Sequence, residues 1–305
     1  MAKIAWIGLG LMGRPMSKHM VDAGHTVLGY DIDPEARRKA REFGVPVAES
    51  QADAVKEAEI IFTMVPAGPD VKKVLTGKDG AFAQAPKGVL AVDCSTIGVA
   101  HAHELHEEAR KAGATYMEAP VSGGTEGARD GNLTFMIGGD KDYADRVTRL
   151  LQPIGDYIAY VGGDGAGQAA KVVNNLIMGV CVTVNCEATD LANRLGLDLK
   201  VFYEIVLRSS GDNWSFRMWN PGVGVVAEAP ASHGYHAGFK TWLLAKDLHL
   251  ALEAARASGS NVATAEAAHA LLTAHAETGG ADMDATSLVL SLAKQGEATS
   301  RIAAE

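Results

Sequence analysis

Three glycines near the start of the chain have the spacing of a phosphate-binding turn. The hexapeptide Gly8-Leu9-Gly10-Leu11-Met12-Gly13 follows the apolar run Ile4–Ile7 and opens a predicted helix. In such a turn the first glycine permits a sharp bend, the second lets the backbone approach a pyrophosphate, and the third allows close helix–strand packing. Free N–H groups at a helix N-terminus favour anions. All six residues are therefore predicted to bind a dinucleotide cofactor.

An acidic residue ends the second predicted strand. Asp31 stands 18 residues after Gly13, where this fingerprint places a carboxylate that accepts hydrogen bonds from the adenosine ribose. A carboxylate there would repel a 2′-phosphate, so the sequence favours NAD over NADP. Arg37 and Arg38 are the opposing observation, and we expect them to form a solvated helix face after Pro34.

Lys171 and Asn175 stand four residues apart on a long predicted helix, so they share one face. Hydride transfer from an alcohol needs a group that takes the hydroxyl proton, and a lysine serves when burial lowers its pKa. The alternative is a solvated or snorkelling lysine. The neighbouring residues Val172, Val173, Leu176 and Ile177 predict an apolar setting.

Two further segments follow predicted strands. Ser122, Gly123 and Gly124 precede a helix start, and their N–H groups and hydroxyl suit a carboxylate, although a plain helix cap has the same sequence. Ser95 and Thr96 end another strand, at the edge of a doubly wound sheet where ligands gather.

The elements that must position these residues alternate in type over the first half of the chain. Helical patterns separate most of the strands, one ending at Gly24 and another, His101–Ala112, at Gly113. After the turn Gly162–Gly165 a helix is predicted over Gly167–Leu195, and strand signals become scarce. We therefore expect an α/β fold: a Rossmann-type NAD-binding domain (1–163), then an all-α substrate and oligomerisation domain (164–305). The predicted strands are Ile4–Ile7, Val27–Tyr30, Ile60–Val65, Val89–Val92, Tyr116–Ala119, Leu133–Ile137 and Ile158–Val161, each expected to be buried on both faces.

Composition narrows the class of protein. The 305 residues are 47% hydrophobic and carry a formal charge of −9, so we expect neither nucleic acid nor a membrane as a partner. Three cysteines without paired spacing indicate reduced thiols and a cytoplasmic protein. No metal site is expected, since His103 and His106 lie on a polar helix predicted to face solvent. The apolar stretch Val172–Ala192 contains charged and amide residues, so it predicts a buried helix, and its apolar surface around Val180–Val184 predicts a homodimer or homotetramer.

Seven blocks of sequence follow one order and spacing: Ile7–Met16, Met64–Pro66, Asp93–Ile97, Ala119–Gly124, Gly165–Asn175, Ser209–Trp214 and Leu244–Leu248. On these blocks the chain resembles the β-hydroxyacid dehydrogenase family over nearly its whole length, most closely the 3-hydroxyisobutyrate dehydrogenase branch.

The resemblance implies roles for individual residues. It makes Lys171 the general base and acid, with Asn175 orienting the substrate and Ser122–Gly124 meeting its carboxylate. It places Thr96 beside the nicotinamide and Lys246 at the mouth of the site, touching cofactor or substrate. Further residues implied are Met64, Val65 and Pro66 near the adenosine half of the cofactor, and Trp214 as a pocket wall, for which core packing is the equal alternative.

The implied reaction is NAD-dependent oxidation of 3-hydroxyisobutyrate to methylmalonate semialdehyde, in a cleft between the two domains. The alternatives are a sister enzyme acting on serine, tartronate semialdehyde or glycerate, or a sulfonated hydroxyacid. A non-catalytic nucleotide-binding protein is the rival from another class, and it would not need the Lys171–Asn175 pair.

Overall fold

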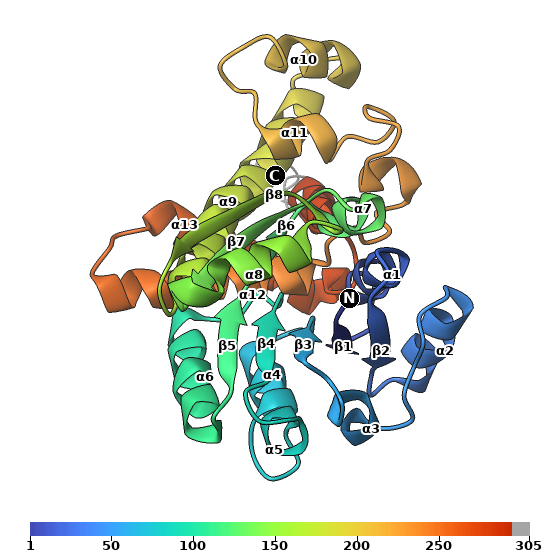
Figure 1. Ribbon diagram of the computed structural model, residues 1–305. Helices are drawn as coiled ribbons and strands as arrows, with labels where there is room; N and C mark the ends of the chain where they lie inside the picture. The colour runs from blue at the N-terminus through green and yellow to red at the C-terminus, as the bar shows by residue number, and fades with distance from the viewer. Residues whose placement is uncertain (295–305) are drawn as a thin grey trace. The chain divides into compact units, whose positions relative to one another are not determined.

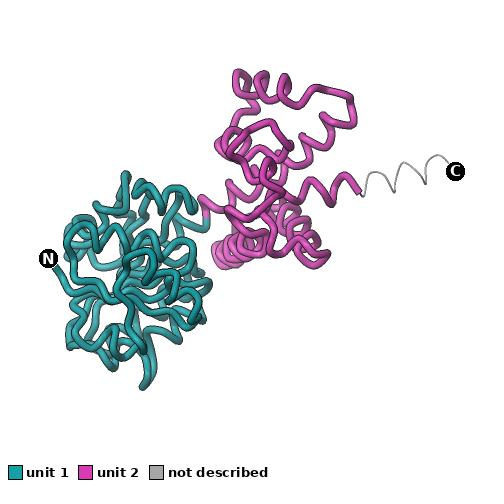
Figure 2. Tube along the Cα trace, turned by 90° about the vertical axis from the view of Figure 1, so that its right-hand side faces the viewer, with its two compact units in different colours: residues 1–172 teal, residues 173–305 magenta. Residues whose placement is uncertain are grey.

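The computed structural model describes residues 1–294 and divides the chain into two compact units, Met1–Val172 and Val173–Glu305 (Figure 2). The first unit is α/β and the second is helical, as the sequence predicts. The predicted domain boundary at residue 163 falls just before the long helix α9 (Ala166–Arg194), whose first turns belong to the first unit.

One eight-stranded sheet forms the centre of the first unit (Figure 1). Its order is β2-β1-β3-β4-β5-β7-β6, with β8 paired to the other side of β7. Strands β1 to β5 are parallel, whereas β7 runs antiparallel to β5 and β6. The strands are β1 (Lys3–Ile7), β2 (Thr26–Tyr30), β3 (Ile60–Thr63), β4 (Leu90–Asp93), β5 (Thr115–Glu118), β6 (Val121–Ser122), β7 (Leu133–Gly139) and β8 (Gly155–Gly162).

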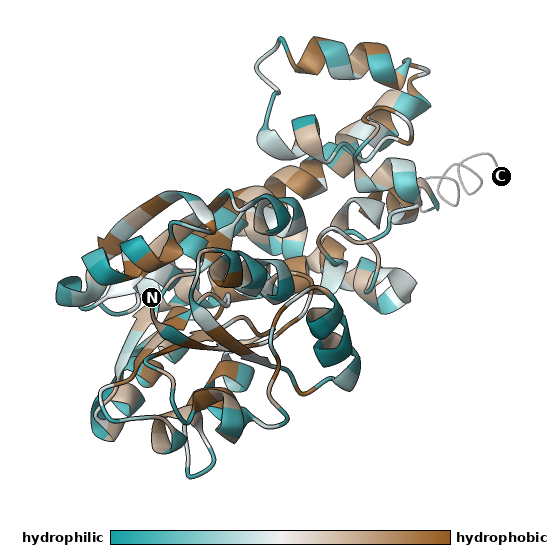
Figure 3. Cartoon of the chain, turned by 45° about the vertical axis from the view of Figure 1, so that its right-hand side comes forward, coloured by the Kyte–Doolittle hydropathy of each residue, from teal (hydrophilic) through white to brown (hydrophobic). Residues whose placement is uncertain are grey.

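Helices cover both faces of this sheet because successive strand residues point to opposite sides. Ile4 and Trp6 belong to a core that includes α1, α2, α7 and α8, while Ala5 and Ile7 belong to a second core with α3 to α6. Figure 3 shows the hydrophobic residues gathered along the strands. The helices are α1 (Gly13–Asp22), α2 (Pro34–Glu42), α3 (Gln51–Val55), α4 (Gly68–Leu75), α5 (Ala81–Gln84), α6 (Val99–Ala112), α7 (Gly124–Asp130) and α8 (Lys141–Leu151).

Two details of the sheet differ from the sequence-based expectation. The two-residue strand β6 has no separate signal in the sequence. Strand β8 is not buried on both faces, since Tyr157 is 65% and Val161 45% exposed. It is an edge strand that pairs with β7 alone among the described strands, so one side lacks a neighbour.

The second unit packs its helices around the remainder of α9. Gly179 of α9 lies so close to α12 that an added Cβ would stand 2.7 Å from the Leu248 side chain, and Cys186 Sγ donates to the Thr286 carbonyl at 3.4 Å. The helices are α10 (Leu199–Val206), α11 (Trp214–Met218), η1 (Pro230–His233), α12 (Thr241–Ser258), α13 (Ala263–His275), η2 (Ala276–Gly280), η3 (Ala285–Ser287) and a last helical segment, 288–294. The low apolar content of 295–305 predicts a frayed tail, but these residues lie outside the part of the chain that the structure describes.

Helix α9 is, among the described residues, the one helix long and apolar enough to cross a membrane by length and composition. Its buried face carries polar side chains that hydrogen-bond within the fold, such as Asn185 with Ser215 at 2.8 Å. Within Val180–Val184, whose apolar character predicts an interface between subunits, Val182 is buried in the fold and Val184 is 47% exposed. The exposed apolar residues instead form a stripe along the whole helix, at Val173, Ile177, Val184, Leu191 and Leu195.

Candidate active site

The three glycines of the first turn have different surroundings. A Cβ on Gly8, which has φ +99°, would stand 2.2 Å from the Met64 carbonyl oxygen, and one on Gly13 would stand 2.0 Å from the Gly8 carbonyl oxygen. A Cβ on Gly10 would meet no protein atom within 4 Å. The fold itself thus requires the first and third glycines, whereas Gly10 borders open space at the start of α1. Such a cradle fits the pyrophosphate of a dinucleotide.

Asp31 lies beside this turn. Its Oδ2 accepts a hydrogen bond from Leu9 N at 2.7 Å, and its Oδ1 accepts one from Asp33 N at 2.9 Å. The carboxylate therefore fixes the glycine-rich turn against the end of β2. Each oxygen has a second lone pair, so the same group still has acceptor capacity for ribose hydroxyls.

The two arginines after Asp31 behave differently. Arg38 pairs with Glu35 and Glu42 on the exposed face of α2, as expected. Arg37 instead folds back: its Nη1 donates to the Asp31 carbonyl at 2.6 Å, and its guanidinium carbon lies 5.5 Å from the centre of the Tyr30 ring. The expectation that both side chains are simply solvated is wrong for Arg37.

The loops after β3 and β4 are joined by hydrogen bonds. Val65 N donates to Ser95 Oγ at 3.0 Å, and Ser95 N donates to Asp93 Oδ1 at 3.0 Å. Asp93 is completely buried and also accepts from Thr63 Oγ1 at 2.7 Å and Tyr116 OH at 2.9 Å. Burial raises the pKa of Asp93 despite these donors. The network brings together two of the predicted segments, Met64–Pro66 and Ser95-Thr96.

The turn predicted to meet a carboxylate lies between β6 and α7. Gly123 and Gly124 have φ values of +135° and +63°, a backbone conformation that is strained for residues with a Cβ atom. The segment begins four residues after the carboxyl end of β5, and Ala119 N donates to the Asp93 carbonyl at 2.7 Å. The chain therefore leaves the sheet at the same edge as the glycine-rich turn.

Lys171 is buried, with 7% of its surface exposed, so the solvated alternative does not hold. The apolar neighbours predicted to enclose it do so only in part. Val172 is buried, but Val173 and Ile177 are 59% and 60% exposed. They belong to the opposite, apolar stripe of α9.

Asn175 and Lys246 both contact Asp247, for which the sequence predicts no role. Asn175, 1% exposed, donates from Nδ2 to Asp247 Oδ2 at 2.6 Å, and Lys246 Nζ lies 3.0 Å from Asp247 Oδ1. Asp247 is thus a buried carboxylate that holds both α9 and α12 side chains. Trp214 is 51% exposed and stacks edge-on with Trp219 at 5.0 Å, which argues against core packing.

His106 does not face solvent. It is 4% exposed, and its Nε2 lies 2.9 Å from Oε1 of the buried Glu118, with Nδ1 3.3 Å from Asp164 Oδ1. The sequence pattern did not single out Glu118 or Gln168, whose backbone N–H donates to the Glu118 carboxylate. Gln168 lies in one of the blocks that resemble the family, and Glu118 directly precedes another. Within residues 1–294, no group of three or more His, Cys, Asp or Glu side chains is arranged so that it could hold a metal ion.

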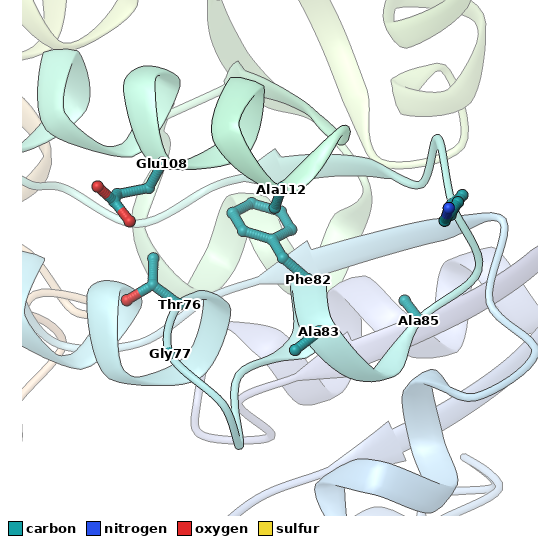
Figure 4. A pocket seen from close by; sticks show the side chains of 8 residues that line it. Thr76, Gly77, Phe82, Ala83, Ala85, Glu108 and Ala112 are labelled. Carbon is teal, nitrogen blue, oxygen red and sulfur yellow. The ribbon is translucent and has the colours of Figure 1, made fainter.

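A surface pocket of about 360 Å³ lies away from these residues (Figure 4). Phe82, Lys87 and Glu108 line it, and Lys87 precedes β4. It therefore sits toward the amino ends of the parallel strands, whereas the glycine-rich turn, Asp31 and Ser95-Thr96 follow the carboxyl ends of β1, β2 and β4. None of the predicted site residues lines this pocket.

Two family models of known proteins match successive parts of the chain. Residues 3–162 match the family model described as the NAD binding domain of 6-phosphogluconate dehydrogenase. Residues 165–292 match the model described as NAD-binding of NADP-dependent 3-hydroxyisobutyrate dehydrogenase.

Relatives with this sequence pattern have two different names. The chain is 42% identical over 261 residues to an NAD-dependent L-serine dehydrogenase of Pseudomonas aeruginosa (86% of this chain, 88% of the relative). It is 40% identical over 266 residues to the human mitochondrial 3-hydroxyisobutyrate dehydrogenase (87% and 79%). A solved structure of Mycobacterium tuberculosis 3-hydroxyisobutyrate dehydrogenase with L-serine is 38% identical and superposes with a TM-score of 0.87, covering 96% of this chain and 99% of that one.

Proposed function

The chain belongs to the β-hydroxyacid dehydrogenase family, and from that premise we propose that it oxidises 3-hydroxyisobutyrate to methylmalonate semialdehyde with NAD. The observation that carries the proposal is the buried Lys171, one helical turn before the buried Asn175. A lysine kept from water at this position is suited to proton transfer and has little value as a solubilising charge.

Bound NAD would supply the acceptor for the hydride of the carbinol carbon. Lys171 Nζ takes the hydroxyl proton as the C–H bond breaks and the carbonyl forms, and it returns the proton in the reverse direction. Asn175 has one amide hydrogen engaged by Asp247 and a second with which to orient the substrate oxygen. The N–H groups of the Ser122–Gly124 turn receive the carboxylate.

The residues that would hold the cofactor are the Gly8–Gly13 turn, Asp31, Met64–Pro66 and Thr96. The preference for NAD rests on Asp31, whose carboxylate would repel a 2′-phosphate. Arg37 lies next to it and is the residue that would allow NADP if its guanidinium moved from the Asp31 carbonyl.

The proposed oligomer is a dimer or tetramer that covers the apolar stripe of α9 defined above. Its five residues are each 47% to 68% exposed and follow spacings of four and seven residues, so they form a single face. The three thiols are unpaired, which supports a reducing, cytoplasmic location.

The substrate is tested by comparing kcat/KM for 3-hydroxyisobutyrate, L-serine and glycerate, following absorbance at 340 nm with NAD. L-serine is the second candidate, because a relative named for it is as similar as those named for hydroxyisobutyrate. A preference for serine or glycerate of more than about tenfold, roughly 1.4 kcal/mol of transition-state free energy, would replace the proposed substrate and keep the enzyme class.

Lys171→Ala tests the catalytic role. Turnover should fall by at least about 100-fold, the scale of general acid–base catalysis. The affinity for NADH should change little, because the residue lies outside the glycine-rich turn. The matched control is Lys56→Ala, whose side chain is 62% exposed and which should turn over normally. Near-normal turnover in Lys171→Ala would refute the assignment.

A further inference from the structure

We propose that Gln168 is a positioning residue for hydride transfer, which holds the loop carrying Thr96 in register with the helix carrying Lys171, and that Glu118 sets Gln168 in place. This inference rests on the proposed function, because it concerns the geometry of the same site. Neither residue contacts the reacting atoms, so both act through their neighbours.

Gln168 joins α9 to the loop after β4 with both ends of its amide. Its Oε1 accepts from Ile97 N at 3.0 Å, and its Nε2 donates to the Ser95 carbonyl at 2.9 Å. The side chain is completely buried, as are Ser95 and Ile97, whereas Thr96 between them is partly exposed. The two hydrogen bonds thus clamp the backbone on either side of the residue predicted to lie beside the nicotinamide.

Glu118 fixes the start of the helix to the end of β5. Its Oε1 accepts from Gly165 N at 2.5 Å and its Oε2 from Gln168 N at 2.8 Å, while His106 Nε2 lies 2.9 Å from Oε1. The carboxylate is completely buried. A negative charge at a helix N-terminus satisfies free N–H groups and opposes the positive end of the helix dipole.

The first turn of α9 is also pressed against the sheet. A Cβ on Gly167 would stand 2.6 Å from the Met136 carbonyl oxygen, and one on Gly138 would stand 2.4 Å from Gly167 N. The first turn of α9 therefore packs directly against the backbone of β7. Lys171 follows Gln168 by three residues, so it lies on the same side of the helix one turn later.

Through these contacts, the buried side-chain amide of Gln168 sets the distance between Thr96 and Lys171. The rates of hydride and proton transfer both depend strongly on the distance between donor and acceptor, and a change of about an ångström alters them greatly. A glutamine that served stability alone would need no bond to both flanks of one loop residue. The clamp should therefore affect the chemical step more than cofactor binding.

The test is Gln168→Met, which keeps the length of the side chain and removes both hydrogen bonds. We expect kcat to fall at least about tenfold, with a larger primary deuterium isotope effect on the hydride, and the Kd for NADH to change by less than about threefold. Ionised Gln168→Glu still accepts from Ile97 N but places a carboxylate oxygen against the Ser95 carbonyl oxygen, so its kcat should also lie below the wild-type value.

The matched control is Ser287→Ala in the second unit, which removes a buried 2.7 Å contact with His275 Nε2. It should lower thermal stability and leave kcat unchanged. If Gln168→Met loses no more turnover than this control, the positioning role is overturned.

Hydrogen exchange of peptide 94–100 provides a readout that needs no turnover. Gln168→Met should speed exchange of the Ile97 amide, because its acceptor is gone, whereas the control should not. If the wild type oxidises no hydroxyacid, the proposed function fails, and the exchange result alone decides whether Gln168 clamps this loop. Unchanged exchange in Gln168→Met overturns the clamp in either case.

Discussion

Gly10→Ala separates the cofactor role of the glycine-rich turn from its structural role. A methyl group there would meet no protein atom within 4 Å, and Gly10 does not have a positive φ. An alanine that fits its backbone conformation stabilises by about 0.4–1 kcal/mol through the unfolded chain. The unliganded variant should therefore melt at the wild-type temperature or slightly above it.

Cofactor binding should respond in the opposite direction. The methyl group occupies the space through which a pyrophosphate approaches the backbone, and we expect at least about tenfold weaker binding of NADH, or about 1.4 kcal/mol. At an NADH concentration of 100 times the wild-type Kd, ligand stabilises the wild type by about 2.7 kcal/mol. The same concentration would stabilise the variant by only about 1.4 kcal/mol by the same relation.

The assay is thermal unfolding with and without NADH, with Kd from nucleotide fluorescence. Gly163→Ala is the matched control, since its Cβ also meets nothing within 4 Å and it lies outside the turn. Gly13→Ala should fail to fold stably, because its Cβ would stand 2.0 Å from a backbone carbonyl oxygen. If NADH stabilises Gly10→Ala as much as it stabilises the wild type, the phosphates do not approach the backbone at Gly10.

Three further outcomes are expected. Asp31→Ser should narrow the preference for NAD over NADP, measured as a ratio of kcat/KM. A wild-type enzyme that favours NADP would show that Arg37 reaches the 2′-phosphate. The variant should also be less stable, because the hydrogen bond from Leu9 N to Asp31 is lost. Because burial raises the pKa of Asp93 in the folded state, the native protein binds that proton more tightly than the unfolded chain. The stability contributed by the protonated Asp93 is complete below the unfolded pKa of about 3.9 and is lost as pH rises through the folded pKa. In urea titrations, the free energy of unfolding of the wild type minus that of Asp93→Asn should therefore shrink with rising pH. A constant or growing difference would contradict this. Ile177→Glu should shift the protein toward monomer in sedimentation velocity, whereas Asn193→Glu on another side of α9 should not, and an unchanged mass for both would remove the stripe as an interface.

The local parts of this protein follow from its sequence. Buried parallel strands show as short apolar runs, and helices end where glycine permits the left-handed conformation, as at Gly24 and Gly113. The glycine-rich turn is readable because its three positions each meet a different steric demand within a few residues. Strand and helix periodicity then implies the α/β unit followed by a helical one.

What only the tertiary structure decided is where buried polar groups find their partners. His106 lies on a helix whose pattern predicts solvent, yet it is buried against Glu118. Strand β8 has the composition of an interior strand and lies at the edge. Gln168 reaches Ser95 and Ile97 across 73 and 71 residues of sequence. Hydropathy and spacing report which residues leave water, but a hydrogen bond between distant segments has no period along the chain. The order of the strands in the sheet and the packing of the first turn of α9 against that sheet determine these hydrogen-bond partners.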